Sequence, residues 1–248
     1  MKINYIKFGT GDKTMLILPG LSVKPICAAP KPVIDAYESL SEDFTIYLFD
    51  QRTDMPEGYD FDQMVEDVYA KIEELDLKDI YLYGVSMGGI MAMLLTAKYP
   101  QVISKLVLCS TCYKGNDQFR EWYDFAKAKD SYKLVDSFMD LVYSKQFNEK
   151  FKEATMVAFK DISDEEFKRF AIQSKALLET DISEYLPELR NKEILLLGSK
   201  QDKVIPYEQM LDLAERLGCE TYFYEGYAHS IYDEAPDIKD RIREFFLR

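Results

Sequence analysis

The sequence predicts an α/β fold built on a mostly parallel β-sheet, with a helical segment inserted into it. Short β-rich runs alternate with helical patterns along most of the chain, which is typical of βαβ units. Between Gly115 and Gly198, by contrast, there is no glycine, and the only proline is Pro187. Because strands in such a stretch would need turn residues, we expect four or five helices there.

Seven runs are rich in aliphatic, β-branched and aromatic residues and are predicted as strands. These strands are residues 3–8, 14–18, 44–49, 80–83, 105–109, 194–197 and 221–224. Helices are expected at residues 32–40, 62–75, 87–99, 207–217 and from about residue 237 onward. The chain thus divides into a first core segment at residues 1–112, a helical insertion at 113–192 and a second core segment at 193–248.

Length, composition and charge exclude several classes of protein. A chain of 248 residues that is 47% hydrophobic can form a full hydrophobic core and is not disordered. The net charge of −13 argues against a nucleic-acid partner, because phosphate contacts need an excess of Lys and Arg. No apolar run approaches the roughly 18 residues of a membrane span, so no membrane partner is expected. The oligomeric state stays open.

The cysteines and the first residues indicate a cytoplasmic protein. Residues 1–8 lack the apolar segment and cleavage site of a signal peptide, and four cysteines are too few for a disulfide scaffold. Cys109 and Cys112 form a CxxC that ends a predicted strand, and a zinc site would need further ligands, so we interpret both as buried thiols. No Walker or dinucleotide-type glycine motif occurs, and we expect neither cofactor nor metal.

The motif Gly84-Val85-Ser86-Met87-Gly88 has the form G-x-S-x-G and lies between a predicted strand and a predicted helix. Such an elbow needs glycines on both sides, because the strained turn leaves no room for neighbouring Cβ atoms. It projects the Ser86 hydroxyl from the carboxyl edge of the sheet and places the Met87 amide at a helix N-terminus. We therefore predict that Ser86 is a nucleophile; the alternative is a tight turn with an incidental serine.

A serine hydroxyl needs a base, and His229 is the only histidine of the chain. It follows the strand predicted at residues 221–224, in a loop that should end near the same edge of the sheet. The acid that orients the base should follow another strand, and Asp202 follows the one predicted at residues 194–197. Asp202 has a second interpretation, as a cap of the helix that begins near Pro206.

With these residues the chain resembles the α/β-hydrolase fold superfamily over essentially its full length. The elbow, the G-x-x-x-D-x-x-x-P stretch at residues 198–206 and the Gly-Tyr-Ala-His loop occur in the order Ser, Asp, His that this fold uses. The run Asp233-Glu234-Ala235-Pro236 also looks like the usual continuation. The resemblance implies a doubly wound sheet with Ser86 as nucleophile, His229 as general base and acid, and Asp202 as the orienting acid.

The loop after the second predicted strand departs from the superfamily pattern. Many members have His-Gly there, whereas this chain has Pro19-Gly20, which leaves the shape of the oxyanion loop open. By resemblance, the backbone N–H groups of Leu21 and Met87 form the oxyanion hole, with Ser22 as the alternative to Leu21.

The resemblance also assigns two further segments. Residues 113–192 correspond to a helical cap between the sixth and seventh strands, and Asp117 at its start is an alternative for the acid. Asp50-Gln51-Arg52-Thr53 looks like a D-x-R-G segment without its glycine. We interpret Asp50 and Arg52 as a structural or loop-positioning pair rather than as substrate contacts.

These residues predict a serine hydrolase that acts on a small ester, thioester or lactone. Aromatic residues occur in every helix expected in the insertion, and some of them must cover Ser86, so we expect an apolar acyl substrate. The same constellation also fits a lactonase, a C–C bond hydrolase or a proton-abstracting lyase, because the fold does not decide the reaction. A non-catalytic ligand-binding relative is the alternative from another class.

Overall fold

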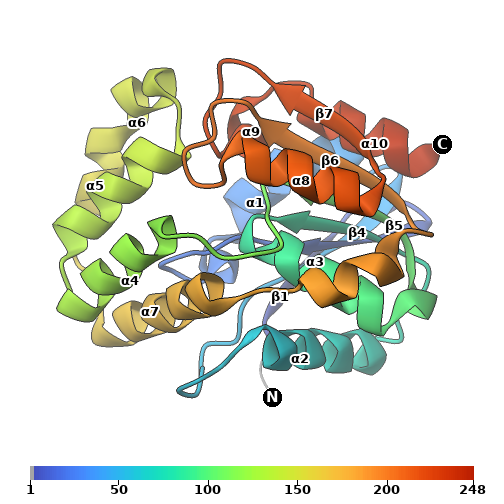
Figure 1. Ribbon diagram of the computed structural model, residues 1–248, viewed down its shortest axis with the longest axis horizontal. Coiled ribbons are helices and arrows are strands. Elements are labelled where there is room, and N and C mark those ends of the chain that lie inside the picture. Colours follow the sequence, from blue (N-terminus) through green and yellow to red (C-terminus); the bar gives the residue numbers. More distant parts are fainter. Residues whose placement is uncertain (1–2) are drawn as a thin grey trace.

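The computed structural model describes residues 3–248; Met1 and Lys2, at the start of the segment inspected for a signal peptide, lie outside the described residues. A seven-stranded sheet has the strand order β1-β3-β2-β4-β5-β6-β7. It forms the centre of the molecule, with helices around it (Figure 1). β1 and β3 pair antiparallel and all other neighbours pair parallel, which confirms the predicted α/β sheet. The strands are β1 (Tyr5–Phe8), β2 (Lys13–Leu18), β3 (Phe44–Phe49), β4 (Ile80–Val85), β5 (Ile103–Cys109), β6 (Glu193–Ser199) and β7 (Glu220–Tyr224).

Five core helices lie where the sequence predicts them, with small shifts at their ends, and a short sixth helix after His229 is not predicted. The first helix begins at Pro30 rather than at Pro32, and a 3-10 turn continues it to Leu40. The second begins after Asp60, which forms a capping box with Gln63 and so fixes the start of the helix. The core helices are α1 (Pro30–Tyr37), α2 (Phe61–Glu74), α3 (Met87–Lys98), α8 (Tyr207–Leu217), α9 (Ile231–Glu234) and α10 (Ile238–Leu247).

Helices cover both faces of the sheet, because alternate side chains of each strand point to opposite layers. In β2, Leu16 and Leu18 pack in the cluster that includes α2 and α3, whereas Met15 and Ile17 pack with α1 and α10. All four side chains are at most 1% exposed. The sheet is therefore doubly wound, and its central strands are buried on both faces, as expected of parallel strands.

Four helices follow β5, in agreement with the four or five expected from the stretch without glycine. They are α4 (Gln118–Ala128), α5 (Ser131–Val142), α6 (Lys145–Ala158) and α7 (Asp164–Glu179), and the 3-10 segment Ser183–Leu189 leads on to β6. α4 packs against α7 and α5 packs against α6, at one side of the molecule beside the sheet (Figure 1). We call residues 113–192 the helical insertion.

The helical insertion lies between the fifth and sixth strands of the described sheet, so the expected place between a sixth and a seventh strand is wrong. Residues 3–109 form only five strands, and the sixth begins at Glu193. The expectation applied the superfamily's strand count to a chain whose described sheet has one strand fewer before the insertion. Within residues 3–248, no helix combines the length and the apolar character that crossing a membrane requires.

Candidate active site

Ser86 occupies a strained turn between β4 and α3. Its backbone has φ 51° and ψ −117°, a left-handed φ that non-glycine residues rarely adopt. The turn is held at both ends, because the Ser86 N–H donates to the Cys109 carbonyl at 2.8 Å and the Gly89 N–H donates to the Ser86 carbonyl at 2.8 Å. The predicted strand–turn–helix elbow is therefore present, with Ser86 at the carboxyl end of a central strand.

The glycines of the elbow allow a close approach that side chains would block. A Cβ on Gly88 would lie 2.0 Å from the Leu18 carbonyl oxygen, and a Cβ on Gly84 would lie 2.6 Å from the Gly88 carbonyl oxygen. The first turn of α3 thus rests directly on the end of β2. This contact brings the loop after β2 next to Ser86.

His229 lies between Ser86 and Asp202 and is hydrogen-bonded to both. Its Nε2 is 3.0 Å from Ser86 Oγ, and its Nδ1 is 2.8 Å from Asp202 Oδ2. A carboxylate can only accept, so Nδ1 carries the proton and Nε2 is left to accept from the serine hydroxyl. The three residues come from the carboxyl ends of β4, β6 and β7, where parallel strands converge.

Asp202 is fixed by the loop that carries it. Its second oxygen, Oδ1, accepts the backbone N–H groups of Val204 at 2.8 Å and Ile205 at 2.9 Å. The capping interpretation is wrong, because α8 begins after Pro206 and no side chain caps it. Asp202 Oδ1 instead holds the loop before the helix, and Oδ2 faces His229. Asp117, the alternative acid, is exposed at the start of α4, and the carboxylate that is hydrogen-bonded to His229 is that of Asp202.

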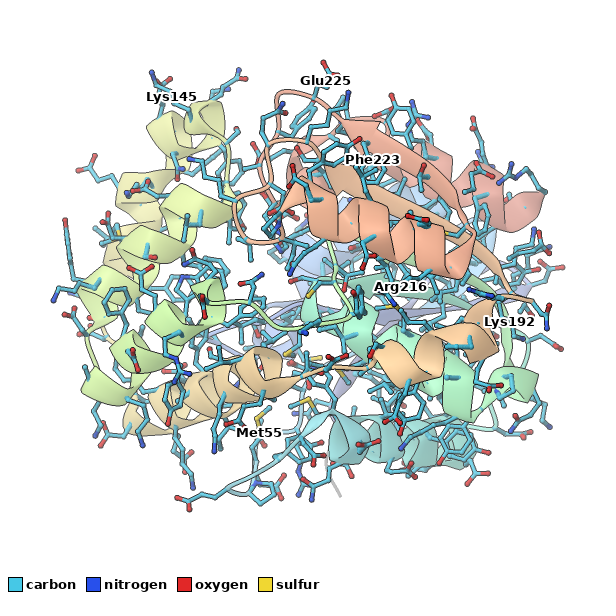
Figure 2. All side chains as sticks on the ribbon, in the orientation of Figure 1. Met55, Lys145, Lys192, Arg216, Phe223 and Glu225 are labelled. Atoms are coloured by element: carbon cyan, nitrogen blue, oxygen red, sulfur yellow. The ribbon has the colours of Figure 1, made fainter. Side chains whose placement is uncertain are left out.

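The loop that carries His229 is attached to the Asp202 loop at several points. Ser199 Oγ donates to the Tyr227 carbonyl at 2.5 Å, and the Gly226 N–H donates to Gln201 Oε1 at 2.7 Å. Glu225, at the top edge of Figure 2, forms an ion pair with Lys200 at 2.5 Å. The imidazole and its acid are thus held by one interlocked pair of loops.

Two hydroxyl residues after β5 were missed in the sequence. Ser110 Oγ donates to the His229 carbonyl at 2.7 Å, and Thr111 Oγ1 donates to the Ser86 carbonyl at 2.7 Å. Both side chains are buried and lie between the nucleophile loop and the histidine loop. The sequence offers one signal for them, their position at the end of a central strand. In the sequence that position is interpreted only through Cys109 and Cys112, which enclose the two residues.

The loop after β2 lies against the nucleophile. A Cβ on Gly20 would lie 3.2 Å from Ser86 Cβ and 3.8 Å from Ser86 Oγ, so this glycine leaves space beside the hydroxyl. Leu21 follows it in the chain, and Met87 begins α3 directly after Ser86. Within residues 3–248, neither the Leu21 nor the Met87 amide donates to another group, so both are available to a ligand.

Asp50 and Arg52 position loops, but they do not pair with each other. Asp50 is buried and accepts the backbone N–H of Cys27 at 2.9 Å and that of Gln51 at 2.8 Å. Arg52 instead forms ion pairs with Asp54 at 3.0 Å and Asp67 at 2.9 Å. The structural role is confirmed, and the pairing is wrong because the two side chains have separate partners.

The CxxC consists of buried free thiols, as predicted. Cys109 ends β5, and both Cys109 and Cys112 are at most 1% exposed. Burial raises the pKa of each thiol to about 12, which suppresses the reactive thiolate at neutral pH. Among residues 3–248, no three His, Cys, Asp or Glu side chains are grouped to hold a metal ion.

A cavity of about 560 Å³ lies between the core and the helical insertion. Ser86 and His229 do not line it themselves, but Val85 directly before Ser86 does, as does Gly20, on which a Cβ would lie 3.8 Å from Ser86 Oγ. Gly20, Leu21 and Val85 line it from the core. Aromatic side chains line it from the insertion, as expected: Phe138 from α5, Phe147 from α6 and Phe159 directly after α6. A substrate bound here would contact an apolar wall on one side and the nucleophile loop on the other.

The sequence and the structure are similar to those of known α/β hydrolases. The model of the α/β hydrolase fold family matches residues 18–236, and the chain therefore belongs to this family of enzymes. One relative, RutD of Agrobacterium fabrum, is named as a candidate carbamate hydrolase; it is 25% identical over 228 residues, which are 85% of each chain.

Two solved structures share the whole fold. The α/β hydrolase enzyme MGS-M2 from a Medee basin deep-sea metagenome library superposes with a TM-score of 0.87 at 22% identity, covering 99% of this chain and 94% of that one. The enol-lactonase from Burkholderia xenovorans LB400 superposes with a TM-score of 0.84 at 19% identity, covering 99% and 96%. Identities this low define the fold and not the reaction.

Proposed function

We propose that this α/β hydrolase is a serine hydrolase that cleaves a small ester, thioester or lactone through an acyl-enzyme on Ser86. The observation that carries the proposal is the hydrogen-bonded chain from Ser86 Oγ through His229 to Asp202. A serine becomes a nucleophile when an oriented neutral imidazole accepts its proton, and this arrangement supplies both the base and the group that orients it.

The reaction then follows from the geometry. Ser86 Oγ attacks the carbonyl carbon while His229 Nε2 takes the hydroxyl proton, and Asp202 stabilises the imidazolium that forms. The amides of Leu21 and Met87 donate to the oxygen that gains negative charge, with Ser22 as the alternative to Leu21. His229 returns the proton to the leaving group, and water repeats the sequence to release the acid.

The cavity supports a preference for short to medium apolar or aromatic acyl groups. Its walls are mostly aliphatic and aromatic, and its volume of about 560 Å³ suits a small molecule rather than a long lipid chain. We further propose that the enzyme acts in the cytoplasm, which is supported by four free cysteine thiols. No cofactor takes part in the steps above.

The test combines turnover with covalent labelling. Wild type is assayed on esters and lactones of graded acyl size, together with a carbamate and an enol-lactone, and is labelled with a fluorophosphonate probe. Ser86→Ala should remove labelling and lower turnover by about 10⁴-fold or more, and His229→Ala should slow labelling strongly.

Three outcomes decide the proposal and its alternatives. Labelling of His229→Ala at the wild-type rate would overturn the proposed mechanism. Turnover without an acyl group accumulating on Ser86 would favour the C–C bond hydrolase or the lyase. Absence of multiple turnover on every substrate would favour the non-catalytic relative.

A further inference from the structure

The cavity is mostly apolar but contains one carboxylate, Asp233, on the wall that α9 supplies. Within the part of the chain that the structure describes, the cavity has one lysine, Lys24, which donates to the Ala158 carbonyl and lies over the Phe159 ring, 5.0 Å from its centroid. Tyr143 and Tyr232 line the same part of the cavity. The Tyr143 hydroxyl donates to Asp233 Oδ2 at 3.3 Å. Among the described residues, this is the one hydrogen bond to the Asp233 carboxylate, and no Lys or Arg forms an ion pair with it.

The position of Asp233 relative to the nucleophile is fixed. α9 follows His229 directly, and the Tyr232 ring meets the imidazole edge to face with centroids 6.3 Å apart. The Ser230 N–H donates to the Val142 carbonyl at 2.9 Å, which ties α9 to the end of α5. The Asp233 carboxylate and the His229 imidazole therefore belong to one rigid unit rather than to a mobile loop.

Tyr143 is held just as firmly, on the side of the cavity that the helical insertion supplies. Its ring stacks on Phe147 with centroids 4.2 Å apart and an interplanar angle of 13°. The next residue, Ser144, donates its N–H to Glu234 Oε1 at 3.1 Å. The short segment between α5 and α6 thus places a hydroxyl beside the carboxylate on α9, and the pair forms a polar patch within an apolar cavity.

The electrostatics indicate a carboxylate that faces the cavity and has accepting capacity to spare. Asp233 is exposed, yet the surrounding protein atoms raise the pKa of its carboxyl by desolvation. Lys239 is nearby but donates to the Tyr232 carbonyl and lies over the Tyr37 ring, 4.8 Å from its centroid. A carboxylate can accept about four hydrogen bonds, and within residues 3–248 only the one from Tyr143 is present.

We infer that Asp233 determines which acyl groups the enzyme prefers. The preferred acyl group is apolar along its length and carries a hydrogen-bond donor at the end that reaches α9. An ammonium is preferred to a hydroxyl as that donor. A ligand donor would take an accepting position of the carboxylate that no described protein group occupies, and a positive charge would form the stronger hydrogen bond. A carboxylate on the substrate would face the like charge of Asp233. The inference rests on the proposed function, because it takes Ser86 as the attacking group.

The experiment compares p-nitrophenyl esters of one acyl chain length that end in ammonium, hydroxyl, methyl or carboxylate, repeated over several chain lengths. For the length that reaches Asp233, wild type should prefer the ammonium over the methyl end by about tenfold or more in kcat/KM. The hydroxyl end should rank second and the carboxylate end last. The preference should reside mainly in KM, because the contact is made equally in the ground state and the transition state.

Asp233→Asn keeps the shape of the side chain and removes its charge, so the ratio of ammonium to methyl substrate should fall toward one. Asp240→Asn is the matched control, since Asp240 is exposed on α10 and does not line the cavity; its ratio should stay at the wild-type value. Fluorophosphonate labelling of Ser86 reports whether each variant is folded.

The result that would overturn the inference is a wild-type enzyme that hydrolyses the methyl-ended esters and shows no preference for the ammonium at any chain length. This outcome needs no variant and so does not depend on folding. An Asp233→Asn variant that labels normally and keeps the full preference would overturn it as well. Failure of the proposed function looks different: no ester of any kind is turned over, and the probe does not label Ser86.

Discussion

The core and the helical insertion contribute different things to the site. Ser86, Asp202 and His229 all come from loops at the carboxyl ends of core strands, whereas the insertion supplies walls of the cavity and none of these three groups. The helices of the core and of the insertion also differ in how deeply they are buried. Nearly every residue of α3 is buried, whereas in the insertion half of the residues of α7 and none of those of α6 are buried. A rigid core is suited to holding reacting atoms in place, and a more exposed layer is suited to setting what fits beside them.

The largest expected effect compares an acid of the core with an acid of the insertion. Asp202→Asn should leave the protein folded and lower kcat by about 10⁴-fold, because the imidazole then loses the partner that fixes its protonated nitrogen. Asp117→Asn, at the start of α4, should leave kcat within about twofold, because surface substitutions of this kind change little. Steady-state kinetics on one ester measure both.

A damaging Asp117→Asn variant beside a harmless Asp202→Asn variant would reverse this assignment and place part of the chemistry in the insertion. Circular dichroism spectra of the two variants serve as the control for folding. The two carboxylates differ in their surroundings, since Asp202 is buried and hydrogen-bonded and Asp117 is exposed. That difference is the reason to expect unequal effects.

One side chain of the insertion reaches the nucleophile region directly. Arg169, on α7, is 4% exposed, and its Nη2 donates to the carbonyls of Ser22 at 3.2 Å and Val23 at 3.1 Å. Burial lowers the pKa of the guanidinium, with Asp50 and Glu166 acting in the opposite sense. These hydrogen bonds orient the peptide groups that follow Leu21, so the insertion controls the loop that is expected to bind the oxyanion.

Arg169→Met should therefore lower kcat by about tenfold, less than the loss of an oxyanion donor itself, because the Leu21 amide is misplaced rather than removed. KM should change less than kcat, and Arg169→Lys should restore part of the rate through a single donor. Lys168→Met is the control, since Lys168 is exposed on the same helix. Equal losses in both methionine variants would mean that the effect comes from the helix and not from the contact.

The sequence could predict the three residues Ser86, Asp202 and His229 because each of them follows a strand of the sheet. Ser86, Asp202 and His229 follow strands of one parallel sheet, and the carboxyl ends of such strands must meet at one edge. Arg169 and Asp233 could not be predicted, because a helical pattern states which residues share a face but not which distant loop that face meets. The four helices of the insertion were predicted, whereas their packing on the core depends on contacts between residues more than a hundred positions apart, such as Arg169 and Ser22.

The smallest expected effect concerns the outer surface of the insertion. Val157, on α6, is 63% exposed, so Val157→Ala removes little buried area and should change the free energy of unfolding by less than about 0.5 kcal/mol. Leu106→Ala in β5 leaves a cavity in the fully buried sheet and should cost about 3 kcal/mol. Urea denaturation followed by tryptophan fluorescence measures both, since Trp122 is the only tryptophan and lies on α4. If Val157→Ala cost as much as Leu106→Ala, the outer surface of α6 would be packed against something in solution, and the contrast between a buried core and an exposed insertion would fail.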